Sequence, residues 1–139
     1  MSPGNRSRLL GETGSLTAFL AVLAVALFAL VGLVVDGGAA IAAKRAAAAE
    51  AEQAARAGAD QLSLRGLRSD QIVLNPRAAL AAAVAYTDAA GHPGTASVDG
   101  LTVTVTVRLV EPTTILSMIG IDHLKVSATA SATVVHGVT

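Results

Sequence analysis

Cysteine is absent from this 139-residue chain, so the protein forms no disulfide and offers neither a thiol nucleophile nor a thiolate metal ligand. Tryptophan is also absent, and the aromatic residues are Phe19, Phe28 and Tyr86. Ten basic residues balance ten acidic ones, so no excess positive charge is available to bind a phosphate backbone. With no basic stripe and few rings on which bases could stack, the sequence argues against nucleic acid as a partner.

The sequence also has little that could support catalysis. Its three histidines, His92, His123 and His136, are dispersed and belong to no HExxH motif or carboxylate cluster. The adjacent Gly37 and Gly38 are not followed by the Lys and Ser or Thr of a phosphate-binding loop. We therefore predict no catalytic residue, no metal site and no cofactor, and expect a protein that is not an enzyme.

The longest feature of the sequence is an apolar run without a charge, residues 16–35. Twenty helical residues cover about 30 Å, which is the hydrocarbon thickness of a bilayer. The run therefore predicts a single transmembrane helix surrounded by membrane lipid. A secretory signal peptide remains the alternative, because Ala40-Ile41-Ala42 offers a cleavage site and would release a soluble extracellular binding protein. Signal peptides have apolar cores of about 7–15 residues, so the length favours the span.

The orientation of the span follows from the charges around it. Two basic residues precede it, Arg6 and Arg8, and two follow it, Lys44 and Arg45, so their count is tied. The free amino terminus adds positive charge to the first pair, whereas Asp36 stands directly at the other end. We expect residues 1–15 in the cytoplasm and the chain beyond the span outside it.

Asp36 is the charged residue next to the span and is a candidate functional residue. Two interpretations stay open for it. It marks the boundary between lipid and water, or it is a functional charge that contacts a basic group of a partner.

Residues 36–62 are rich in alanine and contain no proline, which predicts a stem helix that continues outside the membrane. Gly37 and Gly38 lie where the helix leaves the lipid, and we expect a bend or swivel there. A stripe with sevenfold spacing, which we call the predicted packing stripe, consists of Ile41, Ala48, Ala55 and Leu62. Its small residues favour close packing, either against the chain's own domain or against another subunit, including a second copy in a homo-oligomer.

The remaining residues, 63–139, predict an extracytoplasmic α+β domain. Asn75 and Pro76 mark the start of a second helix after a connector, residues 64–75. Val and Thr alternate in two long segments, residues 101–110 and 124–134, which predicts half-buried strands. Asp99-Gly100 predicts the hairpin turn that joins a shorter strand, residues 95–98, to the first of them.

The segment between the two long strands predicts a short helix that opens at Pro112 and ends at Gly120. This connection is too short to recover the length of a strand of about 30 Å, so the strands should pair antiparallel. The expected fold is therefore α+β, with the stem helix and the second helix packed on a three-stranded antiparallel sheet.

Several segments carry a family resemblance. Residues 14–19 (GSLTAF), residues 34–38 (VVDGG) and the helix that ends in AARAGA resemble the amino-terminal region of TadE/TadG-like proteins of Flp-type (tight adherence) pilus systems. Residues 103–107, 112–116 and 126–130 are similar to the outer domain of the same group.

The resemblance implies a membrane-anchored, pilin-like component that works with other membrane or pilus-assembly proteins in building a pilus or a related secretion assembly. Prepilins of type IV systems carry a glutamate five residues after the glycine at which they are cleaved. Here Phe19 follows Gly14 at that distance, and Leu16 follows Gly11. The resemblance therefore implies an uncleaved accessory component rather than a subunit of the pilus shaft.

Overall fold

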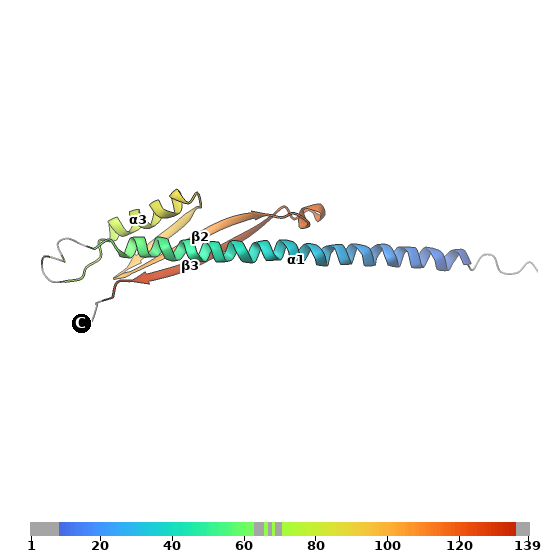
Figure 1. Ribbon diagram of the computed structural model, residues 1–139, viewed down its shortest axis with the longest axis horizontal. Helices are drawn as coiled ribbons and strands as arrows, with labels where there is room; N and C mark the ends of the chain where they lie inside the picture. The colour runs from blue at the N-terminus through green and yellow to red at the C-terminus, as the bar shows by residue number, and fades with distance from the viewer. Residues whose placement is uncertain (1–8, 63–65, 67, 69–70, 136–139) are drawn as a thin grey trace, which may run out of the picture. The chain divides into compact units, whose positions relative to one another are not determined.

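The computed structural model describes residues 9–62, 66, 68 and 71–135 (Figure 1). Its elements are α1 (Leu9–Ala59), α3 (Pro76–Ala89), β1 (Gly94–Asp99), β2 (Thr102–Pro112), the 3₁₀ helix η1 (Leu116–Ile119) and β3 (His123–Thr133). The three strands form one antiparallel sheet in the order β1-β2-β3. The predicted α+β class is confirmed, with its long N-terminal helix, second helix and three-stranded sheet.

The described residues fall into two compact units. The first unit, which we call the apolar unit, comprises the chain up to Gly38 together with Thr113–Asp122. The second, the α+β unit, comprises Ala39–Pro112 and the chain from His123 onward. Helix α1 contributes residues to both units. The domain boundaries expected at residues 15, 35 and 62 stay predictions.

Helix α1 contains 51 residues and is dominated by alanine, leucine and valine, which include the best helix formers. It passes through Gly37 and Gly38 without interruption, and neither glycine has a positive φ. A Cβ atom added at either position would meet no atom within 4 Å. The bend expected at these glycines stays a prediction.

The sheet buries the apolar side chains of its central strand. Val103, Val105 and Val107 of β2 are fully buried, whereas the threonines between them are half-exposed. On the exposed face, hydroxyl groups of β2 pair with those of β3, as in Thr104 with Ser131 at 2.8 Å between the oxygens. The alternation of Val and Thr therefore separates a buried face from a polar one, as the sequence predicts.

The hairpin turn lies one residue later than the sequence predicts. Asp99 pairs with Thr102, so the two loop residues are Gly100 and Leu101 rather than Asp99 and Gly100. Gly100 has a φ of 57° at the first loop position, which tight hairpin turns require and glycine adopts without strain. In this register Val98 lies opposite Val103, so two apolar side chains meet on the buried face.

Alanines of α1 form the other side of this core. The buried residues Ala47, Ala51, Ala54 and Ala55 belong to one cluster with the valines of β2. Helix α3 adds Ala79 and Ala83 to the cluster, and the side chain of Asn75 caps its first turn by accepting the N–H of Ala78 at 3.2 Å. The absence of larger side chains at these positions allows helix and sheet backbones to approach closely.

The connector expected at residues 64–75 lies partly outside the described residues. At its two ends, Leu62 and Leu74 form an isolated antiparallel bridge. The N–H of Asn75 donates to the carbonyl of Gln61 at 2.9 Å, and the Leu74 side chain is buried in the core. The beginning of α3 is therefore fixed beside the end of α1.

The short helix predicted from Pro112 is in part wrong. Pro112 is the last residue of β2, and the helix is a 3₁₀ turn limited to Leu116–Ile119. Its end is as predicted, because Gly120 adopts the left-handed conformation with a φ of 89°. Its late start reflects a contact from outside the segment, since the side chain of Asp36 binds the amides of Thr114 and Ile115 before it and of Leu116 at its first position.

Candidate functional site

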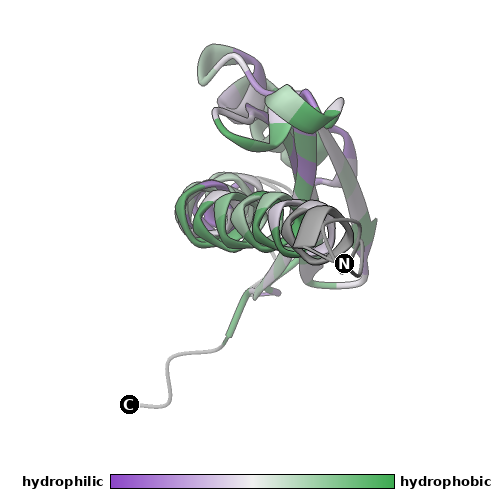
Figure 2. Ribbon diagram, turned by 90° about the vertical axis from the view of Figure 1, so that its right-hand side faces the viewer, coloured by the Kyte–Doolittle hydropathy of each residue, from purple (hydrophilic) through white to green (hydrophobic). Residues whose placement is uncertain are grey.

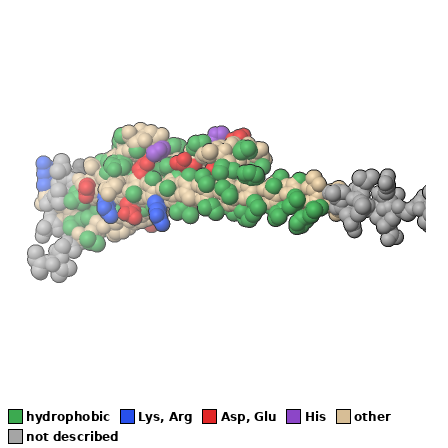
Figure 3. Space-filling view, turned by 45° about the vertical axis from the view of Figure 1, so that its right-hand side comes forward, with side chains coloured by type: hydrophobic (Ala, Val, Ile, Leu, Met, Phe, Trp, Pro, Cys, Tyr) green, Lys and Arg blue, Asp and Glu red, His purple; other side chains and the backbone are tan. Residues whose placement is uncertain are grey.

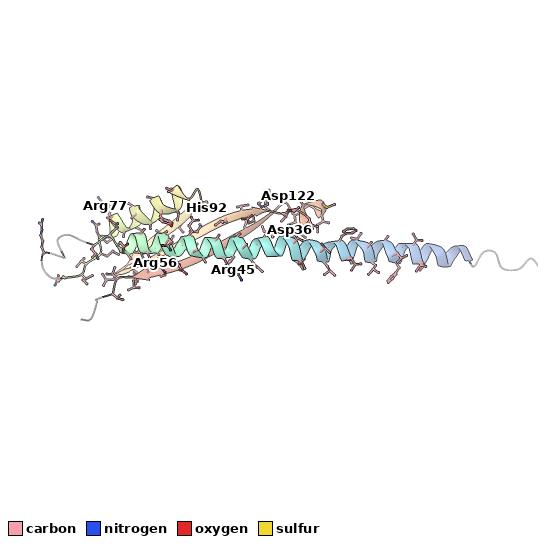
Figure 4. The ribbon with its side chains drawn as sticks, in the orientation of Figure 1. Asp36, Arg45, Arg56, Arg77, His92 and Asp122 are labelled. Atoms are coloured by element: carbon pink, nitrogen blue, oxygen red, sulfur yellow. The ribbon has the colours of Figure 1, made fainter. Side chains whose placement is uncertain are left out.

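The Asp36 carboxylate binds the backbone of a distant segment in the apolar unit (Figure 4). Its side chain is buried, with 3% of the residue exposed. Oδ1 accepts the N–H of Thr114 at 2.9 Å, and Oδ2 accepts the N–H groups of Ile115 at 3.0 Å and Leu116 at 2.7 Å. Three successive amides therefore converge on one carboxylate, an arrangement that we call the Asp36 cap.

The chemistry of this contact is that of an anion at the start of a helical turn. The first amides of a helical turn have no partner within the turn, and a negative charge satisfies them and interacts favourably with their dipoles. The N–H groups of Leu116 and Thr114 lower the pKa of the Asp36 carboxyl from its ordinary value of 3.8, against the effect of desolvation, which raises it. Asp36 is therefore ionised at neutral pH.

The segment held by the Asp36 cap, Thr113–Asp122, also contains hydrogen bonds of its own. We call it the apolar turn. The N–H of Thr113 donates to the carbonyl of Asp122 at 3.0 Å, and the N–H of Ile121 donates to that of Leu116 at 3.1 Å. Two hydroxyl groups also bind within it, Ser117 Oγ to the carbonyl of Thr114 and Thr113 Oγ1 to that of Ile121.

The apolar turn packs against α1 through apolar side chains. Gly32 permits the closest approach, because a Cβ atom there would lie 2.7 Å from Cγ2 of Ile115. Nearer the N-terminus of α1, Val25 and Phe28 line a shallow apolar hollow together with residues of the turn. Met118 is 84% exposed, so the turn presents apolar surface as well as burying it.

The predicted packing stripe is only partly buried. Ala55 is buried against the sheet, Ala48 and Leu62 are half-buried, and Ile41 is 58% exposed. Further alanines that α1 buries lie beside the stripe, at Ala43, Ala47, Ala51, Ala54 and Ala59. The role of the stripe stays a prediction.

The α+β unit contains two polar contacts that the sequence pattern did not indicate. Nδ1 of His92 lies 2.6 Å from Oε2 of Glu50, which joins the loop after α3 to α1 (Figure 4). Nζ of Lys44 donates to the carbonyl of Ser127 at 2.6 Å, which joins α1 to β3. Both pairs are far apart in the sequence, so no local motif could have revealed them.

Within residues 9–62, 66, 68 and 71–135, no group of three or more His, Cys, Asp or Glu side chains could hold a metal ion. His92 is engaged with Glu50, and His123 is the exposed first residue of β3. His136 lies outside the described residues.

The N-terminal part of α1 is long and apolar enough to cross a membrane, judged by length and composition. The hydropathy colouring of the ribbon marks hydrophobic residues along this helix (Figure 2). Their side chains are almost all exposed, and the space-filling view draws them in green (Figure 3). A core helix of a soluble protein would bury such a segment, whereas here Phe19, Leu23 and Phe28 remain uncovered.

Comparison with known proteins yields one match. Residues 14–61 match a family model described as "Tad: Putative Flp pilus-assembly TadE/G-like". The match covers the apolar and alanine-rich parts of α1 and ends before α3 and the sheet, and it confirms the resemblance of the N-terminal region. No curated protein and no solved structure matches the chain.

Proposed function

We propose that this protein is a single-pass, membrane-anchored, non-enzymatic and pilin-like accessory component of an Flp-type pilus or related secretion assembly. The match to the TadE/G-like model implies a component of Flp pilus assembly and supplies the premise. The observation that carries the anchoring is the uncovered apolar surface of α1 between Gly14 and Asp36. Lipid is the solvent in which such a surface is stable.

The proposed topology follows the charges. Residues 1–15 lie in the cytoplasm, residues 16–35 cross the membrane, and the stem at residues 36–62 and the domain at residues 63–139 lie outside the cytoplasm. Asp36 then stands at the outer boundary of the span, where its negative charge is matched by the amides of the Asp36 cap. In this proposal Asp36 organises the apolar turn rather than taking part in chemistry.

The proposed partners are other membrane and pilus-assembly proteins, or a second copy of this chain. Support comes from the part of the predicted packing stripe that the chain leaves uncovered. Ile41 is an exposed β-branched residue five positions beyond Asp36, at the start of the stem. An apolar side chain next to a membrane surface is suited to contact a neighbouring helix.

Membrane extraction tests the anchoring. The intact chain should remain in the membrane pellet after a carbonate wash, with the mass of the full sequence. Val22→Arg should release it, because an arginine near the centre of a span costs about 2.5–3.5 kcal/mol on insertion scales. Val135→Arg is the control, since Val135 is exposed and lies outside α1. Crosslinking in the same membranes before extraction should identify the partner.

A shortened, soluble species would contradict the proposal. Cleavage after Ala42 would remove the span and leave Ala43 and the later buried alanines of α1 on the domain. The secreted protein would therefore keep its core, and its mass distinguishes it from the anchored chain.

A further inference from the structure

We propose that the apolar turn, Thr113–Asp122, is embedded in the membrane leaflet on the side of the C-terminal domain, where Met118 and Ile119 contact lipid acyl chains. This inference rests on the proposed function, because it requires α1 to cross the bilayer. It adds a second membrane contact, which begins at Thr113, 77 residues beyond Asp36. Neither the apolar run nor the family match indicates this contact.

The position of the apolar turn along α1 places it beside the predicted span. Ile115 packs against Gly32, and Met118 and Ile119 share the apolar hollow with Val25 and Phe28. Phe28 lies eight residues before Asp36, which is about 12 Å along a helix axis. The tip of the turn therefore lies beside the second half of the predicted span rather than beyond its end.

This conclusion does not depend on the exact placement of the bilayer. The uncharged run is bounded by Glu12 and Asp36. A span of about twenty residues placed anywhere between them ends no earlier than Gly32. Phe28 and Val25 lie inside the span in every such placement, and so does the part of the turn that packs on them.

The backbone of the apolar turn is suited to lipid. An unsatisfied N–H group costs several kcal/mol in hydrocarbon, so irregular backbone is stable there only if its polar groups are paired. The Asp36 carboxylate accepts hydrogen bonds from the N–H groups of residues 114–116. The N–H groups of residues 113, 118, 120 and 121 donate to carbonyls within the turn. Seven amides of the apolar turn therefore have acceptors, three in the Asp36 carboxylate and four within the turn.

The composition and exposure of the side chains in the turn also favour contact with lipid. No charged residue occurs between Glu111, which precedes the turn, and Asp122, which is its last residue. Met118 is 84% exposed and Ile119 is 61% exposed, which leaves two large apolar residues in contact with solvent unless something covers them. The exposed surface of α1 beside them is the proposed lipid contact, so acyl chains reach both without a break.

The absence of cysteine makes a direct test possible. Met118→Cys labelled with the environment-sensitive dye NBD places one probe on the turn of the full-length chain, reconstituted in phosphatidylcholine vesicles. Val22→Cys is the control inside the span, and Val135→Cys is the control outside it, and all three side chains are exposed. Lipids that carry a nitroxide on the acyl chain quench probes in the membrane, whereas iodide quenches probes in water.

We expect the probe at position 118 to emit at shorter wavelength, to be quenched by nitroxide lipid and to resist iodide, as the probe at position 22 does. The probe at position 135 should show the opposite response. Quenching of position 118 by iodide while position 22 is quenched by lipid would overturn the embedded turn and leave the anchor intact. Resistance of position 118 to both quenchers would also overturn it, because protein would then cover the turn.

Failure of the proposed function has a different signature. If α1 does not cross the bilayer, the probe at position 22 is not quenched by nitroxide lipid. The companion variant Asp36→Ala removes the acceptor of the three amides. It should increase iodide quenching at position 118 and leave position 22 unchanged. An unchanged response at position 118 would show that the turn is not held in the membrane by the Asp36 cap.

Discussion

The two parts of α1 differ in the apolar side chains that they expose and bury. In the apolar unit, large residues such as Phe19, Leu23 and Leu33 are exposed. In the α+β unit, the residues that the same helix buries are alanines such as Ala47 and Ala51. Both parts have high helix propensity, so the local sequence does not distinguish them.

This contrast indicates which surroundings each part of α1 requires. Alanine exposes little apolar surface and lets the sheet approach, so the protein itself supplies the core of the α+β unit. Leucine and phenylalanine side chains on all sides of a helix are stable in apolar surroundings, and the described residues leave most of these side chains uncovered. The contacts that organise each unit differ too, because the Asp36 carboxylate binds the amides of the apolar turn, whereas apolar side chains of β2 form the core of the α+β unit.

The largest expected effect comes from a charge in the core of the α+β unit. Val105→Asp places a carboxylate at a position that is 1% exposed, and we expect a loss of roughly 3–5 kcal/mol from an uncompensated buried charge. Val110→Asp is the matched control on the same strand, because Val110 is 58% exposed, and we expect a change within about 0.5 kcal/mol. Urea denaturation with hydrogen exchange at the amides of β2 measures both. Equal effects would contradict the assignment of the two faces of β2.

The faces of the sheet could be predicted because alternation along a strand is a local signal. Val103, Val105 and Val107 are spaced by two residues, which places them together whatever their partner strand. The hairpin register was not fixed by this signal. A slip of two residues keeps every side chain on the same face, and the choice depends on the pairing of Val98 with Val103 and on the position of Gly100.

The candidate site was less predictable, because its parts are distant in the sequence. Asp36 was identified by its position beside the apolar run, but its partners are 78 to 80 residues away. Backbone amides carry no sequence signature, so no pattern indicated that Thr114 or Leu116 would bind it. The role of the packing stripe stays a prediction. Sevenfold spacing gave Ile41, and the alanines that α1 buries on the adjoining side of the helix include Ala43 and Ala47.

The second prediction concerns a smaller effect, a loss of amide protection that is confined to the apolar unit. Asp36→Ala removes the acceptor of three amides, so hydrogen exchange should become faster at Thr114, Ile115 and Leu116. The amides of β2 should keep their rates, because the sheet does not depend on this carboxylate. Asp122→Ala is the control, since the exposed Asp122 contributes its backbone carbonyl to the turn. Unchanged exchange rates at residues 114–116 would contradict the Asp36 cap.

The same three amides should report the ionisation of Asp36. Its pKa is lowered in the folded protein, so the stabilisation is complete above the ordinary value of 3.8 and is lost as the pH falls through the lower folded value. Exchange corrected for its intrinsic pH dependence should therefore be constant from about pH 7 to about pH 5 and rise only in stronger acid. A rise already near neutral pH would contradict the lowered pKa, and Asp36→Asn should remove the dependence.

The last prediction compares the two parts of α1 by the same substitution, Gly to Ala, which should change the stability in opposite directions. Gly38→Ala adds a methyl group where no atom lies within 4 Å, so it should stabilise the helix by about 1 kcal/mol through the higher propensity of alanine. Gly58→Ala makes the same change where the Cβ atom would lie 2.9 Å from Val103 Cγ1 and 3.0 Å from the carbonyl of Ala79. There we expect a loss of about 1–3 kcal/mol from overpacking, which exceeds the gain in propensity. Thermal unfolding in detergent micelles, followed by circular dichroism, compares the two variants. If both raised the midpoint, the close contact of α1 with α3 and β2 would be absent, and propensity alone would govern the helix along its length.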